Sequence, residues 1–103
     1  MTLATKFPAN DWRCKYFGPD NLPKTLDRVE KLRHALPPSM SMPQAALRFI
    51  LSNPTVSTTI VGMRKPGHVT ENIAASDAGP LEPAVLETLK AHRWDRTPQR
   101  WSD

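Results

Sequence analysis

Apolar residues in the first half of the chain recur with the period of an α-helix. When residues 22–36 are wound at about 100° per residue, one stripe collects Leu22, Leu26, Val29, Leu32 and Leu36. Asp27 precedes Lys31 by four residues on the exposed side, a spacing that favours an ion pair. Pro37 and Pro38 end the pattern. It therefore predicts a helix over residues 22–36, whereas residues 1–20 have no usable period and are predicted to form turns around aromatic residues.

A second helix is predicted to begin after Ser41 and to end before Asn53 and Pro54. Ser41 and Gln44 have the spacing of a capping box, in which the hydroxyl accepts a hydrogen bond from an unpaired amide and the Gln side chain reaches back. The residues that follow are apolar on most sides of the helix: Ala45, Ala46, Leu47, Phe49, Ile50 and Leu51. We therefore expect this helix to be well buried.

The second half of the chain is predicted to form one strand and then two helices. Residues 56–61, with the sequence VSTTIV, are rich in β-branched side chains and favour a strand. Helices are predicted over residues 66–75 and 83–91, with a turn at Gly79 and Pro80 between them. A lone strand has no partner for its N–H and C=O groups. It implies missing neighbours, another chain or local rearrangement.

Length and charge restrict the function without defining it. The 103 residues allow one compact domain. Lys and Arg number 14 against 10 Asp and Glu, which gives a net charge of +4 and suits a phosphate-bearing ligand or nucleic acid. However, the basic residues form no block of five or six, and base-reading motifs are lacking, so the sequence disfavours a nucleic-acid partner.

Cysteine content and hydropathy indicate a soluble protein of the cytoplasm. Cys14 is the only cysteine, which excludes an internal disulfide and a cysteine-based zinc site and fits a reducing compartment. No His, Cys, Asp or Glu grouping has the spacing of metal ligands, so we expect no metal site. No stretch approaches the roughly 20 apolar residues that a membrane helix needs, so we expect no membrane contact.

The candidate ligand-binding residues lie where the predicted strand is followed by a basic turn and then a helix. The first amides of a helix are unpaired and its dipole is positive there, so this geometry binds anions. Arg64 can grip a phosphate through two parallel hydrogen bonds, whereas Lys65 acts more as a point charge. His68, Glu71 and Asn72 stand at i, i+3 and i+4 and share one helix face. A carboxylate beside a carboxamide suits an adenine, and the cations suit a phosphate on its ribose.

Spacing alone favours a more ordinary interpretation of the same residues. A strand, a basic turn and an amphipathic helix occur throughout α/β proteins without binding a ligand there. Val69 and Ile73 lie on another face of the predicted helix, where they can pack inward.

Several stretches together resemble the aldo-keto reductases, and in particular a bacterial branch of that family. The stretches are ALRFIL at residues 46–51, VSTTIVGMR at 56–64, Val69 with ENIAA at 71–75, and GPL at 79–81. Upstream, FPANDWR at residues 7–13 resembles the loop after the seventh barrel strand of that branch. The resemblance covers nearly the whole chain.

The resemblance implies an α/β fold, namely the C-terminal fragment of a (β/α)8 TIM barrel, mostly helical with about one strand. Residues 1–103 would be a partial domain that runs from the loop after strand 7 through strand 8, helix 8 and a C-terminal helix. Residues 56–61 would be the eighth strand and residues 66–75 the eighth helix.

The resemblance also implies half of an NADPH site, formed by Gly62, Met63, Arg64, Lys65, His68, Glu71 and Asn72. The two cations would meet the 2′-phosphate, the acidic and amide side chains the adenine, and Gly62 and Met63 would line the approach from pyrophosphate to ribose. His68 stands where the family more often has Gln or Arg. Met63 replaces the usual Ala, and Val61 the usual Pro.

The catalytic Asp, Tyr, Lys and His of the family lie on earlier strands, so we expect no catalytic residue in this chain. Tyr16 is the only tyrosine, and nothing around it marks it as a proton donor. Carbonyl reduction needs a group that protonates the developing alkoxide. The sequence therefore predicts the C-terminal segment of an NADPH-dependent aldo-keto reductase (a carbonyl/alcohol oxidoreductase), inactive alone.

The alternative is a stand-alone adenine-nucleotide-binding or protein-interaction module without catalysis. Through its exposed strand, such a chain would pair with the missing barrel half or with another copy of itself.

Overall fold

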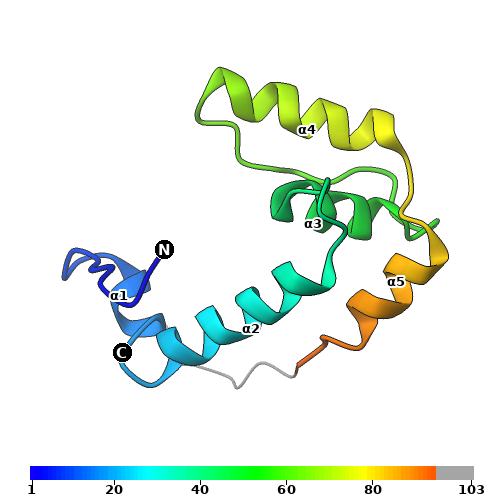
Figure 1. Ribbon diagram of the computed structural model, residues 1–103. Helices are drawn as coiled ribbons and strands as arrows, with labels where there is room; N and C mark the ends of the chain where they lie inside the picture. Colours follow the sequence, from blue (N-terminus) through cyan, green and yellow to red (C-terminus); the bar gives the residue numbers. More distant parts are fainter. Residues whose placement is uncertain (95–103) are drawn as a thin grey trace. The chain divides into compact units, whose positions relative to one another are not determined.

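A computed structural model describes residues 1–94, which form five helices joined by turns and coil (Figure 1). The helices are α1 (Trp12–Tyr16), α2 (Asn21–Ala35), α3 (Met42–Leu51), α4 (Pro66–Ala78) and α5 (Pro83–Lys90). The described chain divides into two compact units, one of Met1–His34 with residues 92–94, and one of Ala35–Ala91. None of the helices in the described part is both long and apolar enough to cross a bilayer.

The four helices predicted from periodicity and helix stops are confirmed as α2 to α5. The Ser41 hydroxyl caps α3 by accepting from the amide of Gln44 at 3.3 Å. Lys31 pairs with Asp27 at 2.8 Å, as their spacing predicts. Helix α1 was not predicted, because five residues are too short to show a period; it begins where the Asp11 side chain accepts from the amide of Arg13.

The strand predicted at residues 56–61 is wrong for the chain as described. These residues run as coil from α3 to α4 (Figure 1), and no strand is present in residues 1–94. The backbone–backbone hydrogen bonds of the described chain include none from residues 57–61, and Ile60 is 98% exposed. High β-propensity reports how well side chains fit a sheet, and without a neighbouring strand there is no ladder to join.

Helices α3 and α4 pack on one another in the second unit, but each keeps an apolar side in solvent. Ala45 and Ala75 are buried at the inner faces, at 4% and 0% exposure. The expectation that α3 is well buried is wrong, since Phe49 and Ile50 are 40% and 41% exposed. On α4, Val69 is 37% and Ile73 56% exposed, so neither of these two side chains is buried.

The C-terminal end of α4 is tied to α3 by a set of long-range hydrogen bonds. The Arg48 guanidinium donates to the carbonyls of Gly79 at 2.9 Å and Pro80 at 3.0 Å. The Ser52 hydroxyl accepts from the amide of Leu81 at 2.9 Å and donates to the Arg48 carbonyl at 2.6 Å. Gly79 turns the chain there with a φ of 75°, which only glycine adopts readily. These hydrogen bonds, called here the Arg48 anchor, hold the C-terminal end of α4 against α3.

Candidate functional site

The residues predicted to bind a cofactor lie on the coil before α4 and on its first two turns. Lys65 is the N-cap residue, with extended φ and ψ of −127° and 151°, and no side chain caps the helix. Pro66 occupies the first turn without an N–H, and the amide of Gly67 has no intrahelical acceptor by position. The first turn holds no acidic residue. The positive end of α4 is therefore open to an anion.

Two cations stand beside this open helix end. Arg64 and Lys65 are both exposed, and neither takes part in an ion pair with any described residue. Charged donors without a protein acceptor keep their hydrogen-bonding capacity for a ligand. The arrangement can hold a dianion such as a phosphate monoester.

Asn72 closes the coil onto the helix. Its amide nitrogen donates to the Gly62 carbonyl at 3.3 Å, so one side chain joins the last part of the coil to the second turn of α4. His68 and Asn72 are half-buried and Glu71 is exposed. One N–H of Asn72 is thus used inside the protein, and its carbonyl and second N–H stay available. The sequence pattern assigned this side chain to a ligand and gave no signal of the bond to Gly62.

The backbone at Gly62 is open to the close approach of a ligand. A methyl group built on Gly62 would meet nothing within 4 Å, and Met63 beside it is 55% exposed. The seven predicted residues are therefore brought into one continuous stretch, accessible from solvent. In the part of the chain that the structure describes, no group of three His, Cys, Asp or Glu side chains could hold a metal ion.

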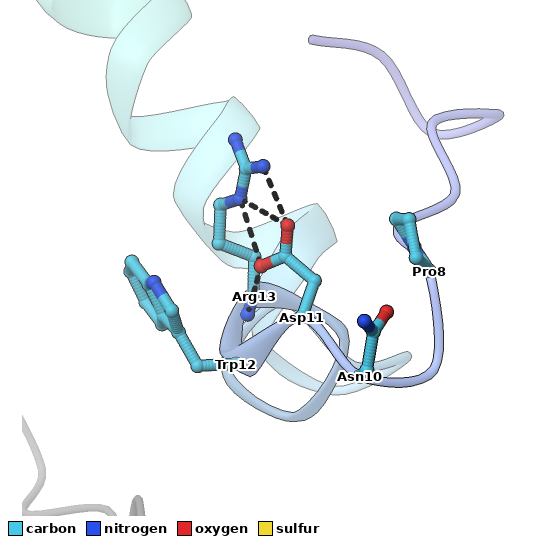
Figure 2. A pocket seen from close by; sticks show the side chains of 5 residues that line it. All are labelled: Pro8, Asn10, Asp11, Trp12 and Arg13. Carbon is cyan, nitrogen blue, oxygen red and sulfur yellow. Dashed lines mark hydrogen bonds and ion pairs between the residues drawn. The ribbon is translucent and has the colours of Figure 1, made fainter.

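A second candidate is a hollow of about 580 Å³ in the first unit, lined by Pro8, Asn10, Asp11, Trp12 and Arg13 (Figure 2). There Arg13 Nε lies 3.0 Å from Asp11 Oδ1, and a terminal guanidinium nitrogen lies 2.6 Å from Oδ2. The Arg13 amide donates to the same carboxylate at 2.9 Å. The opposite charges of this hollow thus satisfy one another, which makes it a weaker ligand site than the start of α4.

The Asp11–Arg13 pair has a measurable consequence for pH dependence. The Arg13 side chain, and then its backbone amide, stabilise the carboxylate and lower the pKa of Asp11 from 3.8 to about 2. We expect the ¹³C carboxyl resonance of Asp11 to titrate near that value. A lowered pKa stabilises the folded form above the unfolded pKa of about 3.9, and this contribution is lost as the pH falls towards 2.

The matched variant for this prediction is Arg13→Gln, which keeps the backbone donor and removes the charge. It should move the pKa of Asp11 back towards 3.8. An unchanged pKa in Arg13→Gln would show that the guanidinium is not its cause.

Comparison with known proteins defines the class to which this chain belongs. The Aldo/keto reductase family matches over residues 3–93, and the chain belongs to that family, which confirms the resemblance. It is 30% identical over 67 residues to the uncharacterized oxidoreductase YqkF of Bacillus subtilis (strain 168), a match that covers 65% of this chain and 22% of that protein. The match thus spans about a fifth of the length of this curated relative. No solved structure matches the chain.

Proposed function

We propose that the chain is the C-terminal segment of an NADPH-dependent aldo-keto reductase of (β/α)8 architecture. Residues 62–72 then carry the half of the cofactor site that holds the adenosine 2′-phosphate. The observation that carries this proposal is the uncapped start of α4, preceded by two cations with no ion-pair partner among the described residues. Family membership supports it, because the family match over residues 3–93 includes residues 62–72.

The residues present fit the phosphorylated end of NADPH. Arg64 offers a planar pair of donors to the 2′-phosphate, Lys65 a second charge, and the Gly67 amide a neutral donor on the helix axis. His68, one turn further, can donate from a ring nitrogen to phosphate or ribose. Only NADP(H) carries this phosphate, so the arrangement distinguishes it from NAD(H).

The adenine is assigned to the next turn of the helix. The exposed Glu71 carboxylate can accept from the exocyclic amine, and the free carbonyl and N–H of Asn72 can bond to ring-edge atoms. Gly62 and Met63 would line the approach from ribose to pyrophosphate, where the absence of a Cβ at Gly62 leaves room.

In this proposal the chain binds and orients but does not catalyse. NADPH would supply the hydride when bound, whereas the product alkoxide must be protonated by an acid, and the resemblance assigns that acid to an earlier barrel strand, outside residues 62–72. We therefore propose no turnover by the isolated chain. Enzyme-like oxidation of NADPH against an aldehyde by the purified chain would contradict this part of the proposal.

Cofactor preference tests the binding proposal. Titration calorimetry should show NADP⁺ binding more tightly than NAD⁺, by about tenfold or more, because one or two charge-assisted hydrogen bonds are gained. The preference should shrink as salt is added, since the contact is exposed. Equal affinity for the two dinucleotides, or no binding of either, would count against a 2′-phosphate site.

The second candidate function is a non-catalytic module for adenine nucleotides or protein interaction. The unpaired backbone of residues 57–61 and the exposed apolar sides of α3 and α4 favour it. An interaction role predicts association that does not depend on nucleotide.

A further inference from the structure

Residues 62–64 are joined to the rest of the described chain by one side chain. Asn72 Nδ2 donates to the Gly62 carbonyl at 3.3 Å, and within residues 1–94 no other hydrogen bond involves this stretch of coil. The next hydrogen bond along the chain is part of the helix start, where the carbonyl of Lys65 accepts from the amide of His68 at 2.9 Å. Asn72 therefore holds this stretch at one end, and the first turn of α4 holds it at the other.

The hydrogen bond from Asn72 folds the coil back along α4. The helix begins at Pro66, and Asn72 lies about 9 Å further along its axis at 1.5 Å per residue. Gly62 is bonded at that level, so residues 62–65 run beside the first two turns of the helix before the chain turns into it (Figure 1). The two basic side chains of this stretch are thus held between the Asn72 contact and the first amides of α4.

The exposure of the helix side chains agrees with this arrangement. His68 and Asn72, four residues apart on one face of α4, are half-buried, whereas Glu71 is exposed. The bond to Gly62 also fixes the orientation of the Asn72 carboxamide, because its nitrogen must point to the coil. Both partners of the bond lie after residues 56–61, so the contact does not depend on what pairs with that segment.

We propose that Asn72 is a positioning residue for the 2′-phosphate, which raises the preference for NADP(H) over NAD(H) by holding the coil that carries Arg64 and Lys65. The inference rests on the proposed cofactor function. Without this bond, the ligand has to order residues 62–64 as it binds, and that ordering lowers the affinity. An adenine contact of Asn72 cannot give such a preference, because both dinucleotides contain the same adenine.

Titration calorimetry with NADP⁺ and NAD⁺ separates the two roles. Asn72→Ala should lower the preference for NADP⁺, measured as the ratio of the two dissociation constants, by about fivefold, because one hydrogen bond is lost. Loss of an adenine contact alone would weaken both dinucleotides equally and leave the ratio unchanged. Glu71→Gln is the comparison for such a contact, and it should not lower the preference. Ser76→Ala, at an exposed position of α4, is the control and should leave both affinities unchanged.

The carbonyl ¹³C resonance of Gly62 reports the hydrogen bond without any ligand. It should move in Asn72→Ala and stay in place in Ser76→Ala. An unaltered chain that binds neither dinucleotide, or both equally, would refute the proposed function and this inference together. If the unaltered chain prefers NADP⁺ and Asn72→Ala keeps that preference, or if the Gly62 resonance does not move, the inference alone is overturned.

Discussion

Replacing Arg64 with Gln is expected to lower the affinity for NADP⁺ by about tenfold to a hundredfold and to leave the affinity for NAD⁺ nearly unchanged. A hydrogen-bonded pair with a charged group is worth about 1.5–3 kcal/mol, and about 1.4 kcal/mol corresponds to a factor of ten. The affinity should fall for NADP⁺ alone, because only this dinucleotide has the 2′-phosphate that the guanidinium would bind. Titration calorimetry with both dinucleotides measures the two affinities.

Two further variants separate a specific contact from a general loss of positive charge. Lys65→Gln should have a smaller effect than Arg64→Gln, because an ammonium lacks the paired donors. Lys24→Gln removes one charge from α2, in the other unit, and should barely change either affinity. If Lys24→Gln weakened NADP⁺ binding as much as Arg64→Gln, binding would reflect net charge and the assigned phosphate contact would be wrong.

The largest effect on stability is expected from Arg48→Met. Its guanidinium donates to the carbonyls of Gly79 and Pro80, and a methionine of similar length leaves both without this donor. We expect the free energy of unfolding to fall by about 1.5–3 kcal/mol. Urea denaturation followed by circular dichroism measures the change.

Arg33→Met on α2 is the matched control. Arg33 pairs with Glu30 at 3.4 Å, and both side chains are more than half exposed, so its removal should cost less than about 0.5 kcal/mol. Equal small losses in the two variants would show that the link from α3 to the end of α4 does not contribute to stability as proposed.

Local sequence rules predicted the helices because the signals that form them are local. The aliphatic stripe of residues 22–36, the Ser41 cap and the flanking prolines act over a few residues each. The strand at residues 56–61 failed for the opposite reason. A strand is stabilised by residues far away or on another chain, so its propensity can be high while its partner is absent.

The sequence predicted which residues make up the candidate site, but not the hydrogen bonds that join them to the rest of the chain. The basic turn, the helix start and the shared helix of His68, Glu71 and Asn72 all follow from residue spacing, and the structure places them together. The bond from Asn72 to Gly62 and the anchor at Arg48 join residues 10 and 31 positions apart. Such contacts depend on how the elements pack, for which a single sequence gives no periodic signal.

The exposed apolar side chains of α3 and α4 show the same limit. Their spacing predicts burial, since a helix apolar on most sides usually lies in a core. Yet Phe49, Ile50 and Ile73 are between 40% and 56% exposed in the described chain. The pattern correctly marks the residues suited to burial, but whether they are buried depends on what else is present to cover them.

The most direct test of a 2′-phosphate site is a comparison of adenosine 2′-phosphate with adenosine 5′-phosphate by amide chemical-shift mapping. We expect the 2′-isomer to bind more tightly and to shift the amides of Arg64, Lys65 and Gly67 most, with smaller changes at Glu71 and Asn72. Equal binding of the two isomers, or shifts centred on the hollow at Asp11 and Arg13 (Figure 2), would contradict it.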